Sequence, residues 1–153
     1  MNPSMRFVAG GALIAYGVVA ILPLRNPSLL VPVLYTAALI FLGFVYDGPS
    51  RSLAWLGIGI CLVSSWSAPW VRQTLMPLLP PEQYAYIIPG LLTYAIFIAG
   101  NVILGASLRG GDLLHRSTGV ILAIAAALSL FLDVFPYALV LLWMGYQLVR
   151  RPS

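Results

Sequence analysis

Residues 118–149 read TGVILAIAAALSLFLDVFPYALVLLWMGYQLV, and this stretch decides how the chain folds. As one helix it would be about 48 Å long, whereas the hydrocarbon core of a bilayer is only about 30 Å thick. The acid and the helix-breaking proline of Asp133-Val134-Phe135-Pro136 interrupt it near the middle. The stretch therefore predicts two short helices, Thr118–Leu132 and Tyr137–Val149, joined by a turn. A single kinked and tilted helix is the alternative.

The rest of the chain is equally apolar. Hydrophobic residues make up 61% of the sequence, charged residues only 8%, and lysine is absent. The mean hydropathy is +0.97. We therefore expect an all-α, polytopic membrane bundle that forms one transmembrane domain over residues 1–153. It would have six membrane-spanning helices in three hairpins, or five if the last tract is one helix. Each of four further apolar segments is long enough to cross a bilayer: Phe7–Leu24, Leu29–Tyr46, Ser52–Trp70 and Ile87–Ser107.

The arginines discriminate between the two topologies. If there are six spans, the side with both termini carries six arginines and the opposite side carries Arg25 and Arg72. If there are five, the C-terminal pair changes sides and the two sides become equal. Because cytoplasmic loops are rich in basic residues, the asymmetry predicts six spans, both termini cytoplasmic, in a membrane of the bacterial inner-membrane type. The six arginines are Arg6, Arg51, Arg109, Arg116, Arg150 and Arg151.

The composition also argues against several kinds of chemistry. The basic residues are spread along the chain instead of forming the basic face of a nucleic-acid-binding protein. His115 and Cys61 are the only histidine and cysteine, so a metal site or a haem site would lack further ligands of these types. No histidine or lysine within a span could activate a serine nucleophile. We therefore expect no catalytic residues, cofactor or metal, and consider an enzyme less favoured than a non-catalytic protein.

Small residues recur at helical spacing in three of the expected spans, which is typical of the faces where membrane helices pack closely. Aromatic residues at the segment ends, among them Tyr46, Phe135 and Tyr137, are expected to mark the membrane interfaces. The three small-residue faces are Gly57, Cys61, Ser64 and Ala68; Gly90, Thr93, Phe97, Gly100 and Leu104; and Gly119, Ala123, Ala126, Leu130 and Asp133.

Five polar positions are candidates for a functional site. Asp133 lies in an apolar tract, where a charge is costly, but a turn or a helix cap is the more common use of aspartate beside proline. Asn101 and Tyr94 lie within the fourth span and could line a cavity or form hydrogen bonds between helices. Arg72 and Glu82 flank the connection between the third and fourth spans, where they could pair as a lid. Residues 71–79 of this connection are expected to form a short helix in the interface.

Three functions remain open. The first is a non-catalytic accessory or scaffold subunit of a larger membrane complex, or a homo-oligomer; its partners would be the lipid bilayer and other membrane subunits or a second copy. The second is a small-solute transporter or a membrane component that binds a substrate. The third is an interfacial lipid-modifying enzyme using Asp133, Glu82 and Arg72. A polar cavity that reaches Asn101, Tyr94 or Asp133 would favour the second function over the first.

Overall fold

The computed structural model describes residues 3–22, 30–78, 82–110 and 114–150; the side chains of Pro3, Arg72, Met76 and residues 82–86 are outside the description. All regular structure in these residues is helical. In chain order the helices are α1 (Pro3–Ile21), α2 (Leu30–Val45), α3 (Arg51–Leu75), the short 3-10 helix η1 (Met76–Leu78), α4 (Glu82–Leu108), α5 (Thr118–Leu132) and α6 (Phe135–Arg150).

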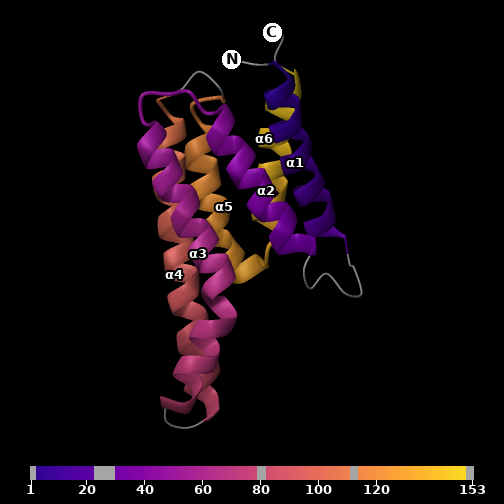
Figure 1. Ribbon diagram of the computed structural model, residues 1–153. Helices are drawn as coiled ribbons and strands as arrows, with labels where there is room; N and C mark the ends of the chain where they lie inside the picture. The colour runs from indigo at the N-terminus through magenta and orange to yellow at the C-terminus, as the bar shows by residue number, and fades with distance from the viewer. Residues whose placement is uncertain (1–2, 23–29, 79–81, 111–113, 151–153) are drawn as a thin grey trace.

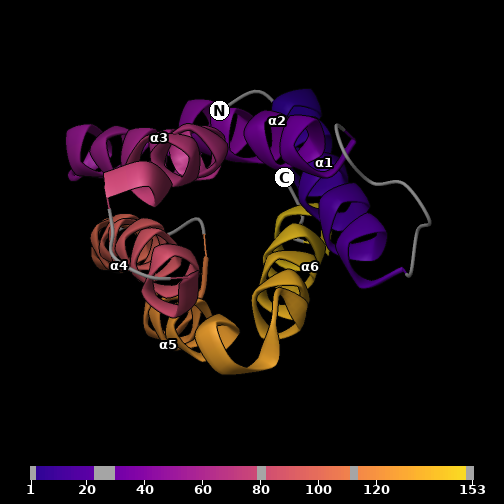
Figure 2. The same cartoon turned by 90° about the horizontal axis from the view of Figure 1, so that it is seen from below.

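The six α-helices form a closed ring. Each packs against the helices before and after it in the sequence, and α1 packs against α6 to complete the ring (Figure 2). Because the helices alternate in direction, the first residues of α1 and the last residues of α6 lie at the same end of the bundle (Figure 1). We call this the arginine end, because the described arginines other than Arg72 lie there: Arg6, Arg51, Arg109, Arg116 and Arg150. The opposite end is the distal end.

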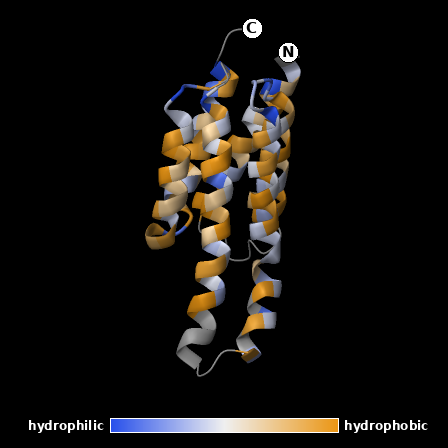
Figure 3. Ribbon diagram, turned by 90° about the vertical axis from the view of Figure 1, so that its left-hand side faces the viewer, coloured by the Kyte–Doolittle hydropathy of each residue, from blue (hydrophilic) through white to orange (hydrophobic). Residues whose placement is uncertain are grey.

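The helices differ in length. Three are long and apolar enough to cross a membrane: Ser4–Ile21 in α1, Arg51–Leu75 in α3 and Ile87–Leu108 in α4. The apolar helices α2 and α5 have only 16 and 15 residues. At the distal end, α3 and α4 therefore project well beyond the other four helices (Figures 1 and 3), and the outer surface of the bundle is predominantly apolar.

The predicted break in the last apolar tract is confirmed. Helix α5 ends at Leu132, and α6 begins at Phe135, two residues earlier than expected. Pro136 is the second residue of α6, where its missing N–H is harmless. Asp133 adopts φ 58° and ψ −163° as the residue that follows α5. It therefore lies in the tight turn itself, and its side chain is exposed.

The expectation of a separate interfacial helix over residues 71–79 is wrong. Helix α3 continues through Pro69 to Leu75, and only Met76–Leu78 form a separate turn of 3-10 helix. Helix α4 likewise begins at Glu82 and contains Pro89. In α4, the hydroxyl of Thr93 donates to the carbonyl of Pro89 at 2.9 Å. Membrane helices tolerate internal prolines where neighbouring groups satisfy the backbone carbonyls that a proline leaves without a donor.

Small residues produce close helix contacts on the predicted faces of the third, fourth and fifth spans, but Leu130 and Asp133 of the fifth-span face are exposed. A Cβ on Gly57 of α3 would lie 2.6 Å from the backbone nitrogen of Leu104, and a Cβ on Gly100 would lie 2.7 Å from the sulfur of Cys61. A Cβ on Gly119 of α5 would overlap the carbonyl oxygen of Gly105 of α4, and a Cβ on Gly105 would overlap that of Gly119. Gly90 differs, because nothing would contact a Cβ there within 4 Å.

Two aromatic residues expected at the membrane interfaces instead lie inside the ring. Tyr137 is buried, and so is Tyr46, whose hydroxyl donates to the carbonyl of Ser107 at 2.5 Å. Each is close to a helix end, but the ring closes around it and provides a buried acceptor for its hydroxyl. Phe135 follows the expectation and is exposed.

Candidate functional site

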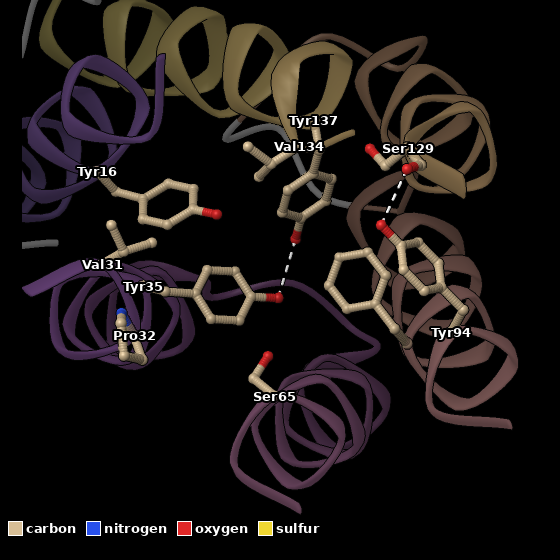
Figure 4. Close-up of a pocket in the computed structure, with 10 residues that line it drawn as sticks. Tyr16, Val31, Pro32, Tyr35, Ser65, Tyr94, Ser129, Val134 and Tyr137 are labelled. Atoms are coloured by element: carbon tan, nitrogen blue, oxygen red, sulfur yellow. Dashed lines mark hydrogen bonds between the residues drawn. The ribbon is translucent and has the colours of Figure 1, made fainter. Parts of the chain in front are cut away.

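The interior of the ring contains a cavity of about 180 Å³ towards the distal end (Figure 4). We call it the tyrosine pocket. Every one of the six helices contributes to its wall, and Val134 of the α5–α6 turn also lines it. The lining residues are Tyr16, Val31, Pro32, Tyr35, Ser65, Tyr94, Phe97, Ser129, Val134 and Tyr137.

The change in side-chain type along the ring axis explains why the cavity forms there. Towards the arginine end, leucines and methionine fill the interior, including Leu42, Leu108, Leu122, Met144 and Leu148. Flexible aliphatic side chains close gaps between helices well. Towards the distal end the inward-facing residues are mainly flat aromatic rings and small serines, which leave space at the axis.

A chain of hydrogen bonds forms one wall of the pocket. The hydroxyl of Tyr137 donates to Oδ1 of Asn101 at 2.8 Å, so its oxygen accepts from the hydroxyl of Tyr35 at 3.1 Å. Asn101 is 0% exposed, and its Nδ2 donates to the carbonyl of Phe97 at 2.9 Å. These bonds join α2, α4 and α6 across the ring and fix the orientation of both phenols.

Aromatic packing holds the other rings in place. The ring centroids of Phe97 and Tyr137 are 5.0 Å apart, and those of Tyr94 and Phe97 are 6.2 Å apart, both with edge-on geometry. The hydroxyl of Tyr94 donates to the carbonyl of Ser129 at 2.9 Å, which connects α4 with α5. Restrained rings of this kind make a pre-formed wall.

Tyr16 stands apart from the other phenols. It is only 4% exposed, and its ring packs against that of Tyr35 with centroids 5.2 Å apart. Its hydroxyl points into the pocket (Figure 4), and no partner for it is found among the described residues. A buried phenol gains free energy from a hydrogen-bond partner, so this hydroxyl is an open position for a bound molecule.

A second cavity of about 170 Å³ adjoins the tyrosine pocket; we call it the side cavity. It shares Ser65, Tyr94 and Phe97 with the pocket and extends along the seam between α3 and α4, past Ala68. The hydroxyl of Ser64 donates to the carbonyl of Thr93 at 2.7 Å and crosses this seam. The two cavities therefore lie next to each other, with Ser65, Tyr94 and Phe97 lining both.

The structure brings together some of the predicted site residues and separates others. Tyr94 lines both cavities, and Asn101 supports the pocket from behind through Tyr137. Asp133 lies exposed in the turn at the distal end and does not line either cavity. Arg72 and Glu82 belong to the projecting part of α3 and α4, and their side chains lie outside the described residues.

The backbone alone keeps Glu82 far from Asp133. Glu82 lies twelve residues before Tyr94 in α4, which is about 18 Å along the helix axis. The hydroxyl of Tyr94 in turn bonds the backbone of Ser129, one helical turn before Asp133. The expected convergence of Asp133, Glu82 and Arg72 on one reaction centre therefore has no support in the backbone.

Sequence reasoning missed Tyr16, Tyr35 and Tyr137 as parts of a site. Each is a single aromatic residue on a separate helix, and one aromatic residue in an apolar helix is equally consistent with core packing or an interface. The available signal was their position: all three lie near the distal ends of their helices, so a closed ring brings them to the same depth.

The lining of the pocket is uncharged. It contains phenol and serine hydroxyls and apolar groups, but no charged side chain. Among the described residues, no group of three or more histidine, cysteine, aspartate or glutamate side chains could hold a metal ion. No protein-family model matches the chain, and no curated protein or solved structure is detectably similar to it.

Proposed function

We propose that this chain is a membrane protein that binds a small, uncharged, ring-sized molecule in the tyrosine pocket, as a substrate-binding or transport component. The open hydroxyl of Tyr16 inside a pre-formed cavity carries this proposal. The cavity has a suitable size, because an apolar cavity of about 150 Å³ in another protein accommodates benzene. The absence of charge in the lining favours a neutral ligand, since an unpaired ion would lose its hydration without compensation.

We propose further that all six helices cross the membrane, with both termini cytoplasmic, in a membrane of the bacterial inner-membrane type. The clustering of described arginines at one end of the bundle supports this orientation, because basic residues are retained on the cytoplasmic side. The shorter helices α2, α5 and α6 are about 22–24 Å long, so the bilayer would thin locally around them.

The test uses the purified protein in lipid nanodiscs and fluorine NMR of three probes: 4-fluorophenol, fluorobenzene and 4-fluorobenzoate. We expect saturable binding of 4-fluorophenol beyond its partitioning into empty nanodiscs. Fluorobenzene should bind more weakly, because it cannot bond the Tyr16 hydroxyl, and 4-fluorobenzoate should not bind. If the fluorine signal of 4-fluorophenol is the same in nanodiscs with and without the protein, the proposal is wrong.

The matched substitutions are Tyr16→Phe and Tyr146→Phe. Tyr16→Phe removes the open hydroxyl and should reduce the affinity for 4-fluorophenol about 2- to 10-fold, the equivalent of about 0.5–1.5 kcal/mol. It should leave fluorobenzene binding unchanged. Tyr146 is 52% exposed on α6 and does not line the pocket, so its loss should change neither affinity.

A second candidate function is the non-catalytic accessory or scaffold subunit, or a homo-oligomer. The projecting part of α3 and α4 favours it. Within the described residues, η1 contacts only α3 and α4, and Trp70 and Leu78 are each 73% exposed. Extraction in a mild detergent followed by native mass spectrometry should then recover a stoichiometric complex. A monodisperse monomer that binds 4-fluorophenol would count against this candidate.

A further inference from the structure

We infer that the ligand of the tyrosine pocket is an alkylphenol or alkylquinone, an oxygen-bearing six-membered ring with an apolar tail. The inference rests on the proposed function, because it names the ligand class of the same pocket. Three features lead to it: the depth of the pocket, the chemistry of its wall and the side cavity that adjoins it.

The helix lengths determine the depth. From Arg51 at the arginine end to the 73% exposed Trp70, α3 rises about 28 Å, close to the thickness of the hydrocarbon core. Tryptophan prefers the membrane interface, so Trp70 marks the distal boundary. Ser65, which lines the pocket, lies five residues nearer the arginine end, about 7 Å below that boundary.

At this depth the pocket would lie close to the distal edge of the hydrocarbon core. The shorter helices α2 and α5 end near the pocket, while α3 and α4 continue past it. Asp133 keeps a carboxylate at the adjacent turn, which draws headgroups and water towards it. The pocket would therefore lie close to the boundary between headgroups and acyl chains. Phenols and quinones with apolar tails reside at that boundary, because their oxygens prefer water and their tails prefer lipid.

The wall of the tyrosine pocket fits the ring of such a molecule. A volume of about 180 Å³ holds one six-membered ring with its substituents but not a bulky headgroup. The aromatic rings of Tyr35, Phe97 and Tyr137 offer edges and faces against which a flat ring packs. The hydroxyl of Tyr16 can donate to either a hydroxyl or a carbonyl oxygen of the ligand.

The side cavity fits the tail. It adjoins the pocket at Ser65, Tyr94 and Phe97 and lies along the α3–α4 seam, where Ala68 also lines it. Its lining, like that of the pocket, contains no charged side chain. The serine hydroxyls that line it already have acceptors within the protein. Ser64 donates to the carbonyl of Thr93, and Ser65 donates to the carbonyl of Cys61. The side cavity is therefore an adjoining, largely apolar space whose serine hydroxyls already have acceptors, and it suits an alkyl chain.

The experiment is competition against 4-fluorophenol in the same nanodiscs, with phenol and 4-octylphenol as unlabelled competitors. Competitor concentrations are expressed per mole of lipid, so that partitioning alone gives no advantage to the longer molecule. We expect 4-octylphenol to displace the probe at a concentration at least 10-fold lower than phenol does. Equal potency of the two competitors would overturn the inference while leaving the proposed function intact. If 4-fluorophenol itself does not bind, both the inference and the proposed function are wrong.

The matched substitutions are Ala68→Trp and Ala95→Trp. Ala68 lines the side cavity but not the pocket, so a large side chain there should abolish the advantage of 4-octylphenol and leave phenol binding unchanged. Ala95 is exposed on the outer face of α4 and serves as the control. If Ala68→Trp does not fold, Ala68→Leu should still reduce the advantage. Full retention of that advantage in a folded Ala68 variant would overturn the inference.

Discussion

Gly105 on α4 and Gly119 on α5 face each other so closely that a methyl group on either would overlap the carbonyl oxygen of the other. The obstacle is backbone on both sides, so no side-chain rotation can relieve it. In lipid, this close approach replaces the hydrophobic effect as the source of helix association. The α4–α5 seam therefore depends on both residues remaining glycine.

The first prediction is that Gly105→Ala and Gly119→Ala each lower the free energy of unfolding by about 1–3 kcal/mol, through overpacking of this seam. Gly11→Ala and Gly59→Ala are the controls, because nothing lies within 4 Å of a Cβ at either position. They should be neutral or stabilising by up to about 1 kcal/mol, since alanine is the better helix former. Equilibrium unfolding in mixed micelles measures both pairs; equal effects would contradict a close α4–α5 contact.

The second prediction concerns the bond between Tyr137 and Asn101. Tyr137→Phe leaves Oδ1 of a fully buried asparagine without its donor, and should cost about 1–2 kcal/mol of stability. Asn101→Leu in the same background should recover part of that loss, because it removes the stranded polar group. A double-mutant cycle checks the coupling between the two positions. Strictly additive effects would mean that this bond is absent from the folded protein.

The third prediction concerns the backbone of Asp133. Its φ of 58° with ψ of −163° belongs to a region that only glycine occupies easily, and such strain costs on the order of 1–3 kcal/mol. Asp133→Gly should therefore raise the thermal unfolding temperature, whereas Asp133→Ala should not. Asp133→Asn and Asp133→Ser should fold normally. Loss of 4-fluorophenol binding in these two variants, at unchanged stability, would instead assign the carboxylate a functional role.

The fourth prediction is the topology. In a Cys61→Ala background, single cysteines at Ser28, Gln83 and Val134 should react with an impermeant thiol reagent added outside intact cells. Cysteines at Ser50, Gly110 and Ser153 should react only after the membrane is opened. This pattern follows from six crossings with the arginine end in the cytoplasm. Labelling of position 153 from outside would favour five crossings.

Much of the helical framework could be predicted from the sequence. The break between α5 and α6 follows from Asp133 and Pro136, because a proline and an acid interrupt an apolar helix in a recognisable way. The packing face with Gly57 and Gly100 follows from small residues at helical spacing. The extension of α3 to Leu75 does not, since a proline such as Pro69 more often marks a helix end than a helix interior.

Only part of the candidate site could be predicted from the sequence. Tyr94 and Asn101 stand out because each is a polar group within an apolar span. Tyr16 and Tyr35 do not stand out, because a tyrosine near the end of an apolar helix is usual at a membrane interface. What turns them inwards is the closure of the ring by α1 and α6, a contact between residues far apart in the sequence.

That closure also sets the order of events during synthesis. A Cβ on Gly10 of α1 would lie 2.9 Å from the carbonyl oxygen of Gly145 on α6. The absence of a side chain at Gly10 therefore allows the first helix to pack closely against the last. More than a hundred residues separate the two, and ribosomes add about 5–20 residues per second. Gly145 of α6 is therefore made about 7–27 seconds after Gly10 of α1. During this interval the ring lacks the wall that α6 supplies, so its interior closes only when the last helix packs against the first.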